Sequence, residues 1–182
     1  MPRPQPRYPP IFSTLKSRYV CEKHRSLHRG RCGARLDHAE RGPPNPRRCR
    51  LQPFSNSPAY ARVAAEAGIQ VVGIDEVRAK GAAHLVATAL KRLSEVADRI
   101  YIDLDIDVLD RCFAPAAPGS RPGGMQPRDI LEAARICGAH PKVAAIDVVE
   151  IDPNRDVADA TVLAAAGSVL SFAAGYRTRS AA

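Results

Sequence analysis

The chain has 182 residues, of which 45% are hydrophobic, enough for one domain with a buried core. No apolar run approaches the roughly 20 residues that span a bilayer, and the proline-rich N-terminus lacks the apolar stretch of a secretory signal. The five cysteines are an odd number without a regular spacing, which favours reduced thiols in a cytoplasmic protein.

The net charge of +8 is concentrated at the N-terminus. Residues 1–50 hold 13 basic and 3 acidic residues, a balance of +10, together with 8 of the 16 prolines. Residues 51–182 hold 14 basic and 16 acidic residues, a balance of −2. We therefore predict two parts: a basic segment over residues 1–50 that is largely disordered, and a folded domain over residues 51–182.

Helical and strand patterns alternate from residue 59 onward. Residues 69–74, 99–105 and 143–150 are short apolar runs typical of buried strands. The patterns at 59–67, 81–97, 127–137 and 156–176 favour helices, and Gly68 and Gly138 are expected to end the first and third. The second is expected to be amphipathic, with Leu85, Ala89, Leu93 and Val96 near one face. Such alternation predicts an α/β fold with parallel strands and right-handed crossovers.

Three aspartates at two-residue spacing follow the second predicted strand. In an extended chain Asp103, Asp105 and Asp107 would project from one face, and the other face would carry Ile102, Leu104, Ile106 and Val108. Neighbouring carboxylates repel one another, so a divalent cation such as Mn²⁺ or Mg²⁺ is expected among them. The alternative is that one aspartate caps the following turn and the others are solvated. For Asp110, three residues further on, we expect a turn-forming role instead.

Glu150 ends the third predicted strand. In parallel α/β sheets the polar site lies outside the carboxyl ends of the strands, where Asp105, Asp107 and Glu150 are all expected. Glu150 could pair with a planar cation such as a guanidinium, or be an exposed strand-end residue. The loop over residues 114–124, rich in Pro and Gly, suits a wall close to a ligand.

The basic segment offers two further alternatives. Cys21, His24, His28 and Cys32 are four ligands of the kind that bind zinc, but their spacing is not that of a common zinc finger, so we expect a chance grouping. The positive charge could attract nucleic acid, but the segment lacks interleaved aromatic residues or a reading motif, which argues against that partner.

Two segments resemble signatures of the ureohydrolase family of arginases, agmatinases and formimidoylglutamases. Residues 102–125 are similar to the pattern S-x-D-x-D-x-x-D-P followed by A-P-x-x-G-x-P-x-x-G-G, and residues 147–156 to D-x-x-E-x-x-P-x-x-D. The resemblance covers the C-terminal part of that family and extends more loosely upstream to about Leu51. It implies a three-layer α/β/α fold with a mostly parallel sheet, N-terminally incomplete here, and trimers or hexamers as homo-oligomers.

The resemblance also implies a site and a chemistry. Asp105 and Asp107 match ligands of a binuclear manganese centre, and Glu150 matches a residue that contacts the amidine or guanidine group of a small substrate. The implied function is manganese-dependent hydrolysis of linear amidines. No residue of this chain is assigned a catalytic role.

The chain departs from the family pattern at three places. Asp103 stands where the family has Ser or Thr, and Arg111 replaces a proline. The upstream G-G-D-H and D-A-H-x-D motifs, which supply the remaining metal ligands, are not found; Leu36-Asp37-His38 is the nearest fragment. We therefore expect a truncated protein of weak or no activity. The alternative function is a non-catalytic family member that binds acidic partners or nucleic acid through its basic segment.

Overall fold

The computed structural model describes residues 16–17, 48–51, 62, 66 and 69–179. Most of the basic segment, its Cys/His group and most of the helix expected over residues 59–67 lie outside these residues. The disorder predicted for residues 1–50 and the boundary after residue 50 therefore stay predictions. Strand β2 (Arg48–Leu51) crosses that boundary.

Two small sheets carry the described strands. β1 (Lys16–Ser17) pairs antiparallel with β2, and β2 pairs parallel with β3 (Gln70–Gly73). In the other sheet β4 (Ile100–Asp105) and β5 (Val143–Val149) run parallel, with an irregularity between Ile100 and Tyr101. The bounds of β3, β4 and β5 lie within a residue or two of the three predicted strands, whereas β1 and β2 were not predicted. The parallel pairing of β4 with β5 confirms the expected α/β class.

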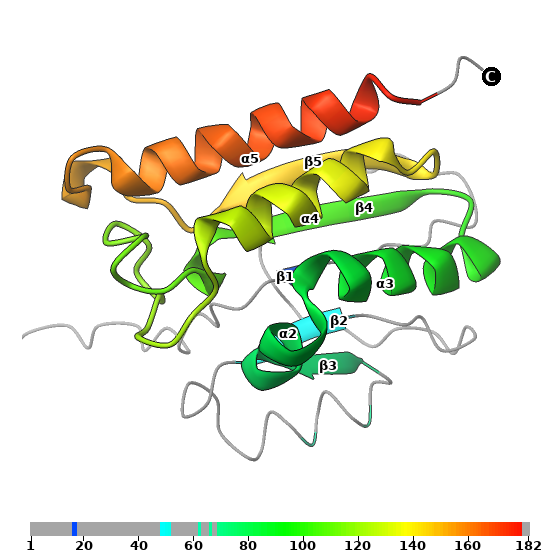
Figure 1. Cartoon of the computed structure of the whole chain (residues 1–182), viewed down its shortest axis with the longest axis horizontal. Helices are drawn as coiled ribbons and strands as arrows, with labels where there is room; N and C mark the ends of the chain where they lie inside the picture. The colour runs from blue at the N-terminus through cyan, green and yellow to red at the C-terminus, as the bar shows by residue number, and fades with distance from the viewer. Residues whose placement is uncertain (1–15, 18–47, 52–61, 63–65, 67–68, 180–182) are drawn as a thin grey trace, which may run out of the picture.

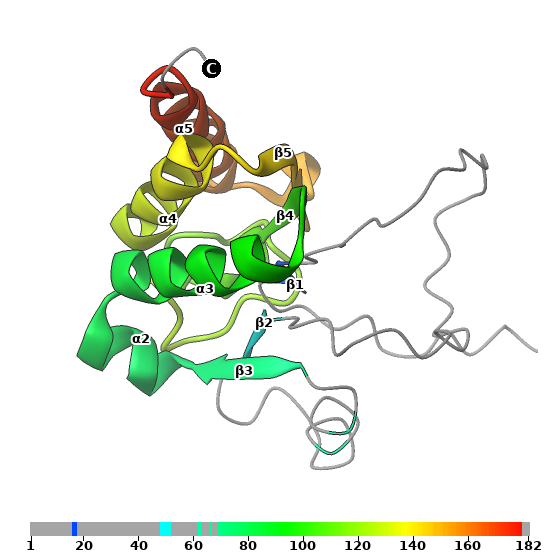
Figure 2. The ribbon, with the colours of Figure 1, turned by 90° about the vertical axis from the view of Figure 1, so that its right-hand side faces the viewer.

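Within residues 69–179 the α-helices are α2 (Ile74–Lys80), α3 (Ala82–Val96), α4 (Pro127–Ala139) and α5 (Ala160–Tyr176). They lie on one side of the strands, with α4 between α3 and α5 (Figure 2). Alternate residues of β4, Ile100, Ile102 and Leu104, are almost completely buried in the apolar core that the helices share. None of the described helices is long and apolar enough to cross a membrane.

Three local predictions are wrong. Ile74 begins α2 rather than ending a strand, because Asp75, Glu76, Arg78 and Lys80 form i,i+3 and i,i+4 pairs that suit a helix. The amphipathic face predicted for α3 buries Leu85, Ala89 and Leu93, and Val96 in the last turn of that helix is 54% exposed. Gly138 lies inside α4 rather than ending it. Finally, α5 begins at Ala160 instead of near Asp156.

Candidate metal and substrate site

The predicted site residues meet at the carboxyl ends of β4 and β5. Asp105 is the last residue of β4 and lies in register with Val149, the last residue of β5. Glu150 follows directly, and Asp107 lies two residues beyond the end of β4. The two strands run side by side beneath α4 and α5, so that both ends reach the same edge of the fold (Figure 1).

The chain stops being extended immediately after Asp105. The Asp105 carboxylate accepts a hydrogen bond from the N–H of Asp107 at 2.9 Å, and Ile106–Val108 forms a 3₁₀ turn. The prediction that all three aspartates share one face of a strand is therefore wrong for Asp107. Asp103 and Asp105 do share a face, and Asp105 is 1% exposed.

Asp107 is a buried carboxyl group with one hydrogen-bonded oxygen. Its Oδ1 accepts the N–H of Gly119 at 2.7 Å, and its Oδ2 is buried without a hydrogen-bond partner among the described residues. Burial raises the pKa of Asp107 to about 6; the Gly119 hydrogen bond lowers that pKa, Glu150 raises it, and Arg121 lowers it. The protein alone therefore only partly stabilises the charge on this carboxylate.

Asp103, which stands where the family pattern has Ser or Thr, lies away from the end of the strand. It is 9% exposed and lies in register with Asp147 of β5. This pair stands two residues before the last pair of the two strands, Asp105 and Val149. Within the part of the chain that the structure describes, no three His, Cys, Asp or Glu side chains are arranged to hold one metal ion. The described residues therefore bring together two candidate ligands, Asp105 and Asp107, rather than three.

Asp110 organises the loop that follows the site, as predicted. Its two carboxylate oxygens accept the N–H groups of Cys112 at 3.0 Å and Gly123 at 2.6 Å. The Cys112 hydrogen bond in particular holds the pKa of Asp110 below its usual value. Gly124 allows the loop to close, because a Cβ atom there would overlap the backbone of Leu109 and Asp110.

Ser120, which holds this loop, was not singled out from the sequence, and Arg111 was noted only as a departure from the family pattern. The buried Ser120 donates to the carbonyl oxygens of Ala114 and Ala117 at 2.8 and 2.9 Å. Arg111, a departure from the family pattern, also donates to the Ala117 carbonyl, at 3.1 Å. This contact gives the arginine a structural role in the loop. The presence of polar residues within a loop rich in proline and glycine is the feature of the sequence that could have indicated these contacts.

Two long-range hydrogen bonds join the loop to helices. Thr161, at the start of α5 and fully buried, accepts the N–H of Ala116 at 3.0 Å. Arg78 of α2 donates to the Gly123 carbonyl at 2.8 Å. The loop that supplies Gly119 to Asp107 is therefore fixed from two sides, which holds the position of the Asp107 carboxylate.

Glu150 has a left-handed backbone conformation with φ of 63°, which is uncommon for a residue other than glycine. Its side chain is half-buried, and its charge contributes to the raised pKa of Asp107. Strained backbone of this kind is found preferentially at functional sites, where the surrounding structure maintains it. The conformation fits a role for Glu150 in the site, and its contact with substrate remains a prediction.

The donor set suits a hard or borderline divalent cation. Asp105 ends β4 and Asp107 lies in the 3₁₀ turn that follows it, and both carry carboxylate oxygens, the ligand type that Mn²⁺ and Mg²⁺ prefer. The buried Oδ2 of Asp107 would gain a partner from such an ion. These two residues fit part of a metal site.

Known proteins of one family are similar to this chain. The sequence profile described as the Arginase family matches residues 51–175. The formimidoylglutamase of Bacillus subtilis (strain 168) is 35% identical over 127 residues, which cover 70% of this chain and 40% of that protein. The agmatinase of Halalkalibacterium halodurans is 39% identical over 95 residues, 50% of this chain and 32% of that protein.

Solved structures show the same fold. The crystal structure of the Bacillus subtilis formimidoylglutamase matches with a TM-score of 0.68 at 35% identity, over 70% of this chain and 40% of that one. A Trypanosoma cruzi formiminoglutamase solved with Mn²⁺ matches with a TM-score of 0.63 at 19% identity, over 68% and 40%, which supports the fold alone. The chain thus spans about 40% of the length of these relatives. With an arginase-like α/β fold and a profile match over most of its length, the chain belongs to the arginase family.

Proposed function

We propose that the chain carries part of the active site of a manganese-dependent hydrolase of linear amidines, similar to the formimidoylglutamases. The observation that carries this proposal is the meeting of Asp105, Asp107 and Glu150 at the carboxyl ends of neighbouring parallel strands. Asp105 and Asp107 would hold Mn²⁺, which supplies Lewis-acid activation of a water molecule in such sites. Glu150 would bind and orient the cationic amidine group through charge-assisted hydrogen bonds.

The proposal includes weak or absent catalysis by these 182 residues alone. A binuclear centre needs more ligands than two aspartates, and the described residues bring no third ligand to them. Other arginase-family sequence, supplied by the remainder of a longer chain or by a partner, would complete the site. Homo-oligomers are part of the proposal by family resemblance. A cytoplasmic location is part of it because the odd number of irregularly spaced cysteines suits reduced thiols.

Turnover assays test this function. The purified chain is incubated with Mn²⁺ and formiminoglutamate, agmatine or arginine, and product is compared with that of the double variant Asp105→Ala, Asp107→Ala. We expect the two proteins to give the same background for all three substrates. Turnover clearly above the double variant would contradict the predicted inactivity and would identify the substrate.

A second candidate function is binding without catalysis, favoured by the charge of +10 on residues 1–50. Deletion of these residues would then abolish salt-sensitive binding to nucleic acid or to an acidic protein. Absence of such binding at low salt would count against it.

A further inference from the structure

The segment that leads from β5 to α5 has an unusual backbone. Among the described residues, those other than glycine with a positive φ are Glu150, Ala158 and Asp159, with φ of 63°, 50° and 57°. All of them lie within residues 150–159, between the two elements. This conformation is unfavourable for a residue with a side chain, so contacts from the surrounding structure must maintain it.

The carboxylate of Asp156 organises this segment. Its Oδ1 accepts the N–H groups of Val157 at 2.9 Å and Thr161 at 3.1 Å, and its Oδ2 accepts the N–H of Val162 at 2.9 Å. The Thr161 hydroxyl also forms a hydrogen bond with it. Burial raises the pKa of Asp156, but these hydrogen bonds outweigh that effect and hold the pKa below its usual value. Asp156 is therefore a carboxylate near neutral pH and anchors the first turn of α5.

Thr161 connects this anchor to the loop over residues 114–124. It is completely buried, and its Oγ1 accepts the N–H of Ala116 at 3.0 Å. A carboxylate can only accept hydrogen bonds, so the Thr161 hydroxyl donates its proton to Asp156. That donation leaves the lone pairs of the hydroxyl oxygen for Ala116. Asp156 thus orients the hydroxyl in the direction that allows Thr161 to hold the loop.

The Ala116 residue is tied to both halves of the candidate site. Its carbonyl oxygen accepts the N–H of Asp152 at 3.0 Å, and Asp152 follows Glu150 by two residues. Ala116 also stands three residues before Gly119, whose N–H donates to Asp107 Oδ1 at 2.7 Å. The turn between Ala116 and Gly119 is closed by its own backbone hydrogen bonds. A shift of Ala116 would therefore be passed on to Gly119.

We propose that Thr161 is a positioning residue of the candidate metal and substrate site. Oriented by Asp156, its hydroxyl fixes Ala116, and Ala116 sets the positions of Asp107 and Glu150 together. Figure 1 shows the start of α5 at the end of the fold where the loop after β4 lies. The inference rests on the proposed function for its consequence, tighter binding of Mn²⁺ at Asp107. The series of hydrogen bonds does not itself require a metal.

Amide hydrogen exchange in the metal-free full chain, followed by NMR, tests the positioning. Thr161→Val keeps the shape of the side chain and removes the hydroxyl. We expect the N–H groups of Gly119 and Asp152 to exchange at least about tenfold faster in this variant. The Ile100 N–H, which donates to the Lys142 carbonyl at the other end of the strands, should keep its native rate. Native rates at Gly119 and Asp152, or an equal acceleration at Ile100, would overturn the proposal.

Two further variants provide matched controls. Thr161→Ser retains the hydroxyl and should bring the exchange rates within about twofold of those of the native protein. Ser168→Ala removes another completely buried hydroxyl of α5, which donates to the Ala164 carbonyl at 2.9 Å within the helix. This variant should leave the exchange of Gly119 and Asp152 unchanged. Failure of Thr161→Ser to restore the rates, or an equal acceleration in Ser168→Ala, would contradict a specific role for the Thr161 hydroxyl.

Asp156→Asn tests the same hydrogen bonds from the other side and serves if Thr161→Val does not fold. The amide lacks the charge that orients the Thr161 hydroxyl, so Gly119 and Asp152 should exchange at least about threefold faster. Asp159→Asn makes the same chemical change at an exposed residue of this segment and should have no effect on them. Equal exchange in the two variants would count against the proposal.

Isothermal titration with Mn²⁺ measures the consequence for the site. We expect Thr161→Val to bind Mn²⁺ at least about fivefold more weakly than the native chain, and Thr161→Ser and Ser168→Ala to bind with near-native affinity. Native affinity of Thr161→Val would overturn the positioning role and leave the metal site intact. No uptake by the native chain would contradict the proposed function instead, and the exchange of Gly119 and Asp152 would then decide the role of Thr161.

Discussion

At the scale of single residues, the candidate metal site depends on the burial and hydrogen bonding of the Asp107 carboxyl group. This carboxyl group is 2% exposed, yet only one of its oxygens has a hydrogen-bond partner among the described residues. Its pKa of about 6 reflects burial and the charge of Glu150 more than the opposing effects of Gly119 and Arg121. Such a group is costly to ionise in the protein alone, and a bound cation would remove much of that cost.

Asp110 gives a pH-dependent prediction. Its pKa is lowered in the folded protein, chiefly by the Cys112 N–H, so its charged form stabilises the fold. This stabilisation is complete above the unfolded pKa of about 4 and is lost as pH falls through the lower folded pKa. Asp110→Asn cannot accept both backbone N–H groups and should melt at a lower temperature near pH 7.

Thermal melting followed by circular dichroism from pH 7 downward measures this effect. The difference in melting temperature between the native protein and Asp110→Asn should shrink as the pH falls below about 4. A difference that stays constant down to the lowest usable pH would mean that the carboxylate charge does not stabilise the loop.

The sequence allowed part of the site to be predicted residue by residue. Asp105 and Glu150 could be placed because each stands at the end of a predicted strand, and parallel strands bring their carboxyl ends together. Asp107 could not be oriented, because the hydrogen bond from its own N–H to Asp105 turns the chain out of the extended conformation. Arg121 and Thr161 depend on contacts made by a distant loop and helix, which spacing along the chain does not reveal.

At the scale of secondary-structure elements, α4 and α5 pack at unusually close range through two glycines. A Cβ atom on Gly138 would overlap the Phe172 carbonyl oxygen, and one on Gly175 would overlap the Arg135 carbonyl oxygen. The sequence pattern suggested Gly138 as a helix end, since glycine commonly terminates helices. The structure instead uses the glycine inside α4 to let the two backbones approach.

This packing predicts opposite effects for similar substitutions. Gly138→Ala and Gly175→Ala should each destabilise the protein by about 1–3 kcal/mol, because the helices must move apart. Gly167→Ala in α5 is the matched control: its Cβ would lie 3.5 Å from Leu131, an ordinary contact. That change should be neutral or stabilise by up to about 1 kcal/mol, because alanine favours the helix.

Urea unfolding of the three variants distinguishes these effects. We expect the urea concentration at the midpoint of unfolding to be lower than that of the native protein for Gly138→Ala and Gly175→Ala, and equal or higher for Gly167→Ala. The slope of the unfolding free energy against urea concentration should be similar for all three variants. If Gly138→Ala and Gly175→Ala were as stable as Gly167→Ala, the close contact between α4 and α5 would not be as described.

At the scale of the whole molecule, the described fold places two polar features at opposite ends of the β4–β5 pair. Carboxylates gather at the carboxyl ends, and Arg99, Lys142 and Arg179 line a groove at the amino ends. The α/β class was predictable because strand and helix patterns alternate along the sequence. The groove was not, because these three residues are far apart in sequence: the pairing of β4 with β5 brings Arg99 near Lys142, and the packing of α5 adds Arg179.

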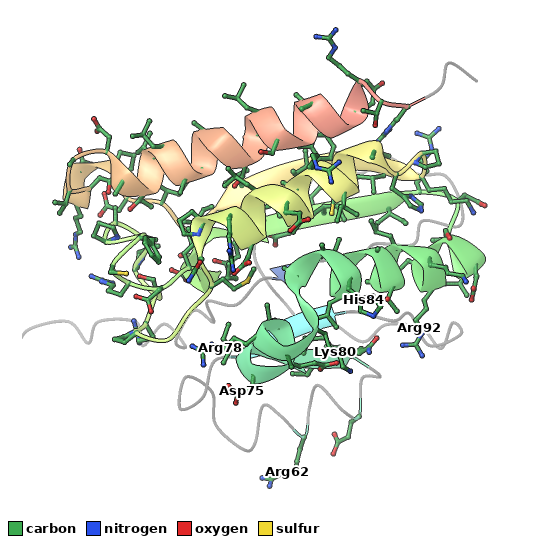
Figure 3. The ribbon with its side chains drawn as sticks, viewed as in Figure 1. Arg62, Asp75, Arg78, Lys80, His84 and Arg92 are labelled. Atoms are coloured by element: carbon green, nitrogen blue, oxygen red, sulfur yellow. The ribbon has the colours of Figure 1, made fainter. Side chains whose placement is uncertain are left out.

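Isothermal titration of Mn²⁺ into the full chain tests the central claim that Asp105 and Asp107 form a metal site. The exposed Asp75 of α2, which forms an ion pair with Arg78 on the surface of the same helix, offers a control away from β4 (Figure 3). We predict saturable Mn²⁺ uptake that Asp75→Ala retains and the double variant Asp105→Ala, Asp107→Ala loses. Absence of uptake, or equal uptake by the double variant, would contradict the account.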